Sequence, residues 1–286
     1  MSRNSDRVGA QPNTDASAPQ QLTQNLENND FSFIVPTEFV DLPSGGSYYH
    51  ASHPLHQKDV IEIKQMTAKE EDMLTSRTLL KKGVAIDRVL SSLIQDKTIN
   101  PDSILVGDRN AIIIAARISA YGNDYNTKVT CPSCGTAQEY GFDLNKANVY
   151  NGGVSSDSDV QNNDDGTFST TLPRTGLSIT FKLLNGADEK RLLDGIEQDR
   201  KNKNAPERNV TRQLVNMIVG VNGNSTAQAV NYVVENIPSV DARHLRNAYK
   251  TANPNVTLDQ HFECSECEYE SELEVPLTTD FFWPNT

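Results

Sequence analysis

The stretch TKVTCPSCGTAQEYGFDL, residues 127–144, places a Cys-X-X-Cys pair between two segments with the composition of short β-strands. A second stretch of this form, DQHFECSECEYESELEVPL, occupies residues 259–277. The apolar and polar residues that flank each pair alternate in the manner that predicts strands. The two predicted hairpins contain every cysteine of the chain, namely Cys131, Cys134, Cys264 and Cys267.

Two hairpins of this kind predict a zinc ribbon with two knuckles. In a knuckle the amides of the turn point toward the two sulfurs, and Gly135 follows Cys134 where a positive φ angle is common. Glu268 occupies the matching place in the second hairpin. Four thiolates form a closed tetrahedral set, which is typical of a structural Zn²⁺ and not of a catalytic one. Iron in the same cage remains the alternative, since tetrahedral sulfur does not separate the two metals.

Two other interpretations of the cysteines fit less well. A redox-active Cys-X-X-Cys normally begins a helix that follows a strand, and a disulfide within either pair would be strained. The amino terminus has no apolar segment after its Arg residues, so a secretory signal is not expected. Folding in a reducing cytosol is therefore predicted, where paired cysteines favour a metal over a disulfide.

The spacing of the two pairs gives the predicted metal a structural purpose. Joining residues 131 and 264 closes a loop of more than 100 residues. By analogy with a disulfide, such a cross-link removes on the order of 4–5 kcal/mol of unfolded-state freedom, apart from the metal-binding energy itself. We therefore expect the segment between the hairpins to be clamped at both of its ends.

The whole pattern predicts an α+β fold. It combines a helical N-terminal region, a two-knuckle zinc ribbon with four cysteine ligands, and an inserted domain with a β-hairpin and several helices. The predicted divisions are an extended polar arm (1–30), a β-rich segment (31–66), a helical region (67–122), the zinc ribbon (123–146 plus 256–279), the inserted α+β domain (147–255) and an aromatic C-terminal tail (280–286).

Local signals predict the helices of the N-terminal region. Thr67 and Glu70 have the spacing of a capping box, and Gly83 is expected to end the helix that they begin. Residues 84–94 repeat apolar side chains at helical spacing. A third, strongly apolar helix follows, with Asp108 as its expected N-cap. Before these helices, residues 31–50 are predicted as two extended pieces around a Pro-Ser-Gly-Gly turn, and 59–66 as a strand.

In the segment between the hairpins, residues 167–184 alternate around a Pro-Arg-Thr-Gly turn, so a β-hairpin is predicted. Strand character returns at 255–264. Four helices are predicted in between, at 187–202, 209–221, 226–237 and 239–252.

Composition limits the kinds of partner. Lys and Arg total 26 against 38 Asp and Glu, which gives a formal charge of −12. This balance opposes binding to a phosphate backbone and suits protein partners. A zinc-ribbon nucleic-acid-binding factor is the alternative function, but its ribbon should carry basic or aromatic residues. The second hairpin is instead flanked by acids, namely Glu263, Glu266, Glu268, Glu270, Glu272 and Glu274.

No pattern indicates an enzyme. The chain has no phosphate-binding glycine loop, nucleophile elbow or Cys/His pair, and no stretch reaches the roughly 18–20 apolar residues that a membrane span needs. His50, His53 and His56 are regularly spaced, but Pro54 precludes a helix there, so a solvated loop is the expected state. His261 precedes Cys264 by three residues and is not needed as a ligand.

The segment DFFWP, residues 280–284, contains two Phe and the only Trp of the chain. Large aromatic side chains are costly to leave in water. Two alternatives follow: the tail folds back onto its own core, or Phe281, Phe282 and Trp283 insert into a neighbouring subunit as partner-binding residues.

Several of these stretches resemble, in the same order, the baseplate hub proteins of T-even-like contractile-tailed bacteriophages. The resemblance rests on LTSRTLLKKGVAIDRVLSSLI (74–94), ILVGDRNAIIIAARISAYGNDY (104–125), VTCPSCG (129–135), TLPRTGLSITFKLLNGADEKRL (171–192) and FFWP (281–284). It runs from about residue 31 to the end, and its most specific parts are the run 106–110, the first knuckle and the terminal aromatics.

The resemblance implies a structural subunit of the virion tail baseplate, without catalytic activity. Other phage baseplate and tail proteins would be its partners in a hetero-oligomeric assembly, with neither nucleic acid nor membrane insertion. Residues 1–30 have no counterpart in the resemblance, and a polar arm of this composition cannot bury enough surface to order itself. The implied role leaves open a transient assembly chaperone as a further alternative.

Overall fold

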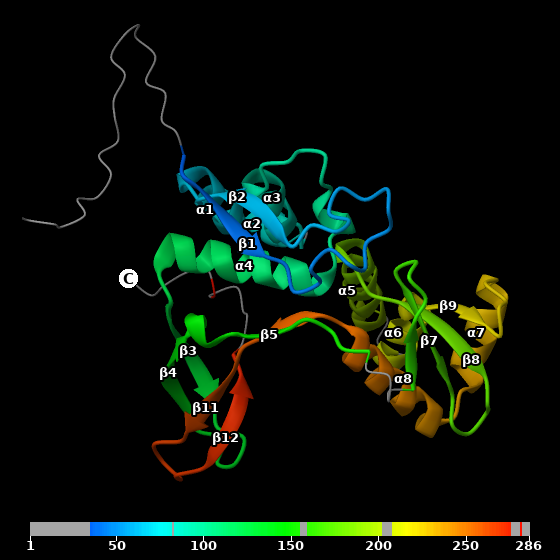
Figure 1. Cartoon of the computed structure of the whole chain (residues 1–286). Helices are drawn as coiled ribbons and strands as arrows, with labels where there is room; N and C mark the ends of the chain where they lie inside the picture. The colour runs from blue at the N-terminus through cyan, green and yellow to red at the C-terminus, as the bar shows by residue number, and fades with distance from the viewer. Residues whose placement is uncertain (1–34, 82, 155–158, 202–207, 276–280, 282–286) are drawn as a thin grey trace, which may run out of the picture. The chain divides into compact units, whose positions relative to one another are not determined.

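The computed structural model describes residues 35–81, 83–154, 159–201, 208–275 and 281, and from Pro36 onward these form one compact unit. The fold is mixed helix and sheet, as predicted, with small antiparallel sheets (Figure 1). The predicted arm, residues 1–30, lies outside the described residues. Within them, no helix is long and apolar enough to cross a bilayer.

The first sheet is a two-stranded antiparallel pair of β1 (Thr37–Asp41) and β2 (Val60–Lys64). The predicted second extended piece before β2 is wrong, because residues 42–59 form a loop rich in turns. Gly46 has φ +71°, and a Cβ built there would lie 2.3 Å from the Lys58 amide nitrogen. The chain therefore doubles back at this glycine, which leaves no room for a strand.

The helices α1 (Ala68–Thr75), α2 (Arg77–Lys81), α3 (Ala85–Leu93) and α4 (Val106–Tyr121) follow, with the short 3₁₀ helix η1 (Pro101–Ser103) before α4. The capping box of Thr67 and Glu70 is confirmed. The prediction of one helix up to Gly83 is wrong, because the chain is extended at Ser76. The Ser76 hydroxyl accepts a hydrogen bond from the Leu79 amide. Ser76 therefore binds the backbone at the start of α2 and separates this helix from α1.

The start of α4 also differs from the prediction. The helix begins two residues before Asp108, whose buried carboxylate lies in the first turn and does not cap the helix. Asp108 Oδ1 accepts a hydrogen bond from the Ser44 amide (3.0 Å), and Oδ2 accepts from the hydroxyls of Ser44 and Tyr49 (2.6 Å each). Burial raises the pKa of Asp108, and these three hydrogen bonds oppose the rise. The carboxylate thus fixes the 42–59 loop to α4.

Two hairpins that are remote in sequence contain the cysteines, as predicted. The first is β3 (Asp124–Thr130) with β4 (Ala137–Asp143), and the second is β11 (Asp259–Glu263) with β12 (Glu270–Glu274). In Figure 1 the green first hairpin and the orange-red second hairpin lie side by side. The short 3₁₀ helix η2 (Leu144–Lys146) follows β4, and β5 (Asn148–Tyr150) then pairs antiparallel with β10 (Asn255–Thr257).

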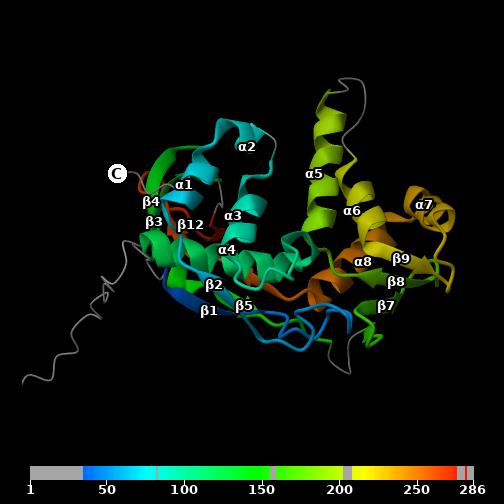
Figure 2. The same ribbon diagram turned by 90° about the horizontal axis from the view of Figure 1, so that it is seen from above.

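Between β5 and β10 the chain forms a four-stranded antiparallel sheet in the order β6 (Val160–Asn162), β7 (Thr167–Thr171), β8 (Ser178–Lys182) and β9 (Ile218–Val221). The predicted hairpin is β7–β8, so this prediction is confirmed. The helices of this part are α5 (Gly186–Lys201), α6 (Asn209–Met217), α7 (Ala227–Asn236) and α8 (Ser239–Ala252). Figure 2 shows α6, α7 and α8 grouped around the sheet.

The prediction of one helix over 209–221 is wrong at its end. The helix stops at Met217, and the apolar run Ile218–Val221 becomes β9, which pairs with β8. Ile218 lies opposite Phe181 in the sheet, and both side chains are buried. A β-branched residue that completes a buried sheet gains more from packing than from one further helical turn.

Candidate metal centre and the contacts that hold it

The two cysteine turns have the same backbone hydrogen bonds. In the first turn the Cys131 amide donates to the Thr136 carbonyl and the Gly135 amide donates to the Cys131 carbonyl, both at 2.9 Å. The equivalent bonds of the second turn join Cys264 to Tyr269 and Glu268 to Cys264, both at 3.0 Å. The two sequences are only loosely similar, but they form the same turn.

The repeated turn requires a left-handed residue after its second cysteine. Gly135 has φ +74° and Glu268 has φ +54°. Glycine adopts this conformation freely, whereas a residue with a Cβ is strained by roughly 1–2 kcal/mol. The second turn thus retains a strain that the first avoids.

Because of this difference, we expect a substitution by glycine to raise the free energy of unfolding at one position, whereas glycine usually lowers it. We expect Glu268→Gly to stabilise the chain by about 0.5–1 kcal/mol and Gly135→Ala to destabilise it by about 1 kcal/mol. A Cβ at Gly135 would meet no atom within 4 Å, so the change there acts through the backbone angle alone. Urea unfolding of both variants measures the effects. Glu270→Gly, in β12, is the matched control and should destabilise; stabilisation by both glycine variants would contradict the prediction.

The structure brings the four sulfurs together. Cys131 Sγ lies 3.7 Å from Cys267 Sγ, and Cys134 Sγ lies 3.7 Å from Cys264 Sγ. All four sulfurs lie within 4.8 Å of one another, and each short pair joins the two hairpins. Four ligands about 2.3 Å from a central ion are about 3.8 Å apart along the edges of a tetrahedron. The two printed separations match such an edge, and the four thiols lie close enough together to hold one metal ion.

The surroundings of the sulfurs differ within each pair. Cys131 and Cys264 are buried, whereas Cys134 and Cys267 are exposed. Hydrogen bonds from the side chain and the amide of Thr136 lower the pKa of Cys134 to about 6. In Cys267, a backbone hydrogen bond to Tyr269 is outweighed by burial and the three neighbouring sulfurs, which raise its pKa. Cys134 is therefore the thiol of these two that ionises first. A thiol with a lowered pKa loses its proton readily, and the thiolate is the form that binds a metal.

The two hairpins also contact each other without their sulfurs. Gln138 of β4 donates to the Glu263 carbonyl (3.1 Å) and accepts from the Ser265 amide (3.0 Å). In the reverse direction, Gln260 of β11 accepts from the Asp143 amide (3.1 Å) and donates to its carbonyl (2.8 Å). Because each glutamine uses both ends of its amide on the opposite hairpin's backbone, the two cysteine pairs are held beside each other by contacts that do not involve the sulfurs.

The histidines remain apart from the sulfur cluster. His50, His53 and His56 lie in the 42–59 loop, as predicted. The loop is less solvated than predicted, because His53 Nε2 is 2.8 Å from Ser103 Oγ and His56 Nδ1 is 2.7 Å from the Tyr49 carbonyl. None of the three belongs to a metal-ligating group among the described residues. His261 is exposed on β11 and lies beside two glutamates, not among the sulfurs.

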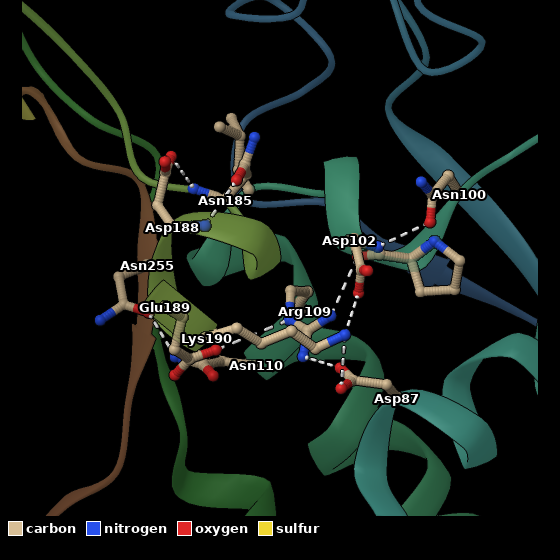
Figure 3. A network of polar contacts seen from close by, with 12 residues as sticks. Asp87, Asn100, Asp102, Arg109, Asn110, Asn185, Asp188, Glu189, Lys190 and Asn255 are labelled. Carbon is tan, nitrogen blue, oxygen red and sulfur yellow. Dashed lines mark hydrogen bonds and ion pairs between the residues drawn. The ribbon is translucent and has the colours of Figure 1, made fainter. Parts of the chain in front are cut away.

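A second polar centre lies at the start of α4, where the sequence predicted no site. Arg109 is buried; its Nη2 donates to Asp87 Oδ1 of α3 (2.8 Å) and its Nη1 donates to the Pro101 carbonyl (2.9 Å). Figure 3 shows the ammonium of Lys190 from α5 between the carboxylates of Asp87 and Asp102, at 2.9 and 2.7 Å. Charges from α3, η1, α4 and α5 are therefore paired in one network.

Each residue of the run 106–110, which contains Arg109, contacts a part of the chain outside α4. The partners are Leu184 for Val106, Pro254 for Gly107, Ser44 and Tyr49 for Asp108, Asp87 and Pro101 for Arg109, and Asn255 for Asn110. This run joins the N-terminal helices to the segment between β5 and β10. The sequence analysis singled out this run through the family resemblance and through Asp108 as an expected N-cap, but neither signal indicated these contacts.

The terminal aromatic segment is described only at Phe281. Its side chain is buried within this chain, with its ring 5.2 Å from that of Tyr125, and its carbonyl accepts a 2.6 Å hydrogen bond from Arg117 Nε. This position corresponds to the fold-back alternative for Phe281. Phe282 and Trp283 lie outside the described residues, so partner binding by them stays a prediction. Sequence reasoning missed Arg117, a buried charge on an otherwise apolar helix.

The chain is an α+β protein in which two hairpins, remote in sequence, bring four free cysteines close together. A family model described as "T4 bacteriophage base plate protein" matches residues 35–283. The chain therefore belongs to the T4 baseplate protein family. Neither the comparison with curated proteins nor that with solved structures found a match.

Membership of this family implies a structural component of the phage baseplate, located in the tail of the virion, with other baseplate proteins as partners. It favours a non-enzymatic role. The matched region includes both cysteine turns and the run 106–110.

Proposed function

We propose that this chain is a structural subunit of the hub region of a contractile-tail baseplate, and that it acts through contacts with other proteins. The family match over residues 35–283 carries the proposal. The formal charge of −12 supports protein partners over nucleic acid, because a phosphate backbone would be repelled. The acids around the second cysteine turn act in the same direction.

We further propose that Cys131, Cys134, Cys264 and Cys267 hold one structural Zn²⁺, so that the two hairpins form a zinc ribbon. The sulfur separations of 3.7 Å support this, since they match the edges of a tetrahedral site. Four protein ligands leave no open position for a substrate or water, which favours a structural ion. In this role the ribbon clamps the inserted segment 147–255 at its two ends.

The arm offers a test of the structural role. We expect deletion of residues 1–30 to weaken incorporation of the chain into baseplates while the melting temperature of the isolated protein stays unchanged. The physical reason is the composition of the arm: it has too few apolar residues to contribute to a core, and we propose that it lies along a neighbouring subunit instead. Quantitative mass spectrometry of purified tails from infected cells measures incorporation, and a thermal melt measures the fold.

The full-length chain in the same tails is the control. Its presence at a fixed ratio to other baseplate proteins supports a hub subunit. Its presence in assembly intermediates but not in finished tails would instead identify an assembly chaperone. Full incorporation of the shortened chain would contradict a partner-binding arm.

A further inference from the structure

The side chain of His53 links the 42–59 loop to η1. Its Nδ1 accepts a hydrogen bond from the Leu55 amide (3.1 Å), and its Nε2 lies 2.8 Å from Ser103 Oγ. The Ser103 hydroxyl in turn donates to the Asn100 carbonyl (2.7 Å). Because a hydroxyl has one proton to donate, Ser103 accepts from His53 Nε2–H. The hydrogen bonds therefore run in a single direction, from the Leu55 amide to the Asn100 carbonyl.

This direction fixes the protonation state of His53. A ring nitrogen that accepts a hydrogen bond carries no proton, so the imidazole is neutral and its proton is on Nε2. A second proton, at Nδ1, would place two donors against each other, namely Nδ1–H and the Leu55 N–H. The Leu55 amide would then lose its acceptor, at a residue whose side chain is fully buried.

The surroundings of the His53 ring disfavour a positive charge on it. The side chain is half-buried, and its ring stacks on that of Tyr49, with the centroids 4.4 Å apart and an angle of 15° between the planes. Burial lowers the pKa of His53, because a charged imidazole would lose part of its hydration. The neutral form that the hydrogen bonds require is thus also the form that the burial favours.

The charged groups around His53 are bound to other partners. The titratable side chains of the elements packed here are Tyr49, His50 and His56 in the loop, Asp102 in η1, and Asp108 and Arg109 in α4. Asp102 binds Lys190, Asp108 binds the Tyr49 hydroxyl, and Arg109 binds Asp87. Within the described part of the chain, no carboxylate forms a hydrogen bond or ion pair with the His53 ring. A charge on this ring would therefore lack an anionic partner there.

The 42–59 loop contacts two parts of the fold. Toward α4, its Ser44 amide and Tyr49 hydroxyl both donate to the buried carboxylate of Asp108. Toward the four-stranded sheet, the ring of Tyr48 lies 5.4 Å from that of Phe168 in β7. The loop thus joins the N-terminal helices to the segment between β5 and β10, and a change in its attachment affects both contacts.

We propose that His53 is a proton-sensitive switch of the 42–59 loop. In its neutral form it joins the loop to η1. On acidification a proton from the solvent binds Nδ1, the hydrogen bond from the Leu55 amide breaks, and the loop loosens.

His56 of the same loop differs from His53 in this respect. Its Nδ1 lies 2.7 Å from the Tyr49 carbonyl, which can only accept, so this nitrogen carries a proton in both the neutral and the charged imidazole. Protonation of His56 therefore leaves its hydrogen bond intact. His50 is exposed, so water can replace the contacts of its ring.

The direction of the pKa shift gives the sign of the pH dependence. The folded chain binds the His53 proton less tightly than the unfolded chain, so acidification favours unfolding. The stability that neutral His53 contributes is fully present above the ordinary histidine value of 6.5. It is lost as the pH falls from that value toward the lowered pKa of the folded chain.

The test compares the full-length natural chain with His53→Gln and with the control His50→Gln. A glutamine amide can donate and accept as neutral histidine does, but it does not ionise. Hydrogen–deuterium exchange in peptides of the 42–59 loop is measured at about pH 7.5 and about pH 5.5. Chains are compared at the same pH, so the intrinsic pH dependence of exchange and any change at the cysteines cancel.

We expect the ratio of loop exchange rates, natural chain over His53→Gln, to rise about threefold or more between about pH 7.5 and about pH 5.5. The same ratio taken with His50→Gln should change by less than about 1.5-fold. Over this pH range the melting temperature of the natural chain should fall by about 2 °C more than that of His53→Gln.

A ratio for His53→Gln that does not change with pH, or an equal change with His50→Gln, would overturn the inference. An NMR titration of the natural chain gives a second readout, which holds even if His53→Gln fails to fold. His53 should take up its proton at a lower pH in the folded chain than in the urea-unfolded chain. Equal titration in the two states would also overturn the switch.

Discussion

Cys264→Ser is expected to lose the proposed metal ion and to lower the melting temperature of the chain by about 10 °C or more. Cys264 is buried, and its sulfur lies 3.7 Å from that of Cys134 on the opposite hairpin. Three thiolates and a hydroxyl bind zinc far more weakly than four thiolates. Since structural zinc contributes roughly 10–16 kcal/mol in small zinc-binding domains, loss of a fraction of this energy exceeds most other single substitutions.

Elemental analysis and a circular dichroism melt of the pure protein measure the two effects. Ser133→Ala is the matched control, because Ser133 lies between the cysteines of the first turn and is exposed. It should retain one metal ion per chain and the natural melting temperature. Removal of the metal from the natural chain with a chelator should reproduce the melt of Cys264→Ser. The zinc proposal would be contradicted if Cys264→Ser retained a full equivalent of metal, or if the natural protein contained no metal. X-ray emission distinguishes zinc from iron.

The second large effect is expected at Gly107. A Cβ built there would lie 2.0 Å from the Pro254 carbonyl oxygen and 2.9 Å from the Asn255 Cα. Both are backbone atoms, so no side-chain rotation can relieve the overlap, and the start of α4 must move away from β10. We expect Gly107→Ala to destabilise the chain by about 3 kcal/mol or more, although alanine favours a helix.

Urea unfolding measures this change, with Gly153→Ala as the control. The nearest atom to a Cβ at Gly153 is the Tyr150 hydroxyl at 3.4 Å, an ordinary contact, so this variant should differ by less than about 0.5 kcal/mol. Equal stability of the two variants would mean that the contact between α4 and β10 does not hold the parts of the chain together. A drop confined to Gly107→Ala would locate the main junction of the fold at the run 106–110.

Predictions from the sequence succeeded where the signal was local. The two cysteine hairpins, the capping box at Thr67 and the β7–β8 hairpin each depend on residues within one turn or one pair of strands. The α3 helix likewise follows from apolar spacing over its nine residues. In each case local backbone preference and tertiary packing favour the same conformation.

Predictions failed where a distant contact outweighed a local preference. Aspartate is a residue type that is favoured at N-caps, so Asp108 was predicted to cap α4. Its carboxylate instead lies within the helix and accepts hydrogen bonds from the Ser44 amide and the Tyr49 hydroxyl, about 60 residues away in sequence. Ile218 extends an apolar helix pattern, but its place opposite Phe181 makes it a strand residue. No window of a few residues contains the partner that decides the conformation in either case.

For this protein, the sequence alone determined that the four thiols occur as two Cys-X-X-Cys pairs and that negative charge dominates, because both properties are covalent and independent of folding. Only the tertiary structure decided that sulfurs from opposite hairpins lie 3.7 Å apart, and which segment each residue of the run 106–110 contacts. It also decided that Glu263 lies opposite Glu270. Such pairings depend on strand register and on the closure of long loops, which arise from the packing of the chain as a whole.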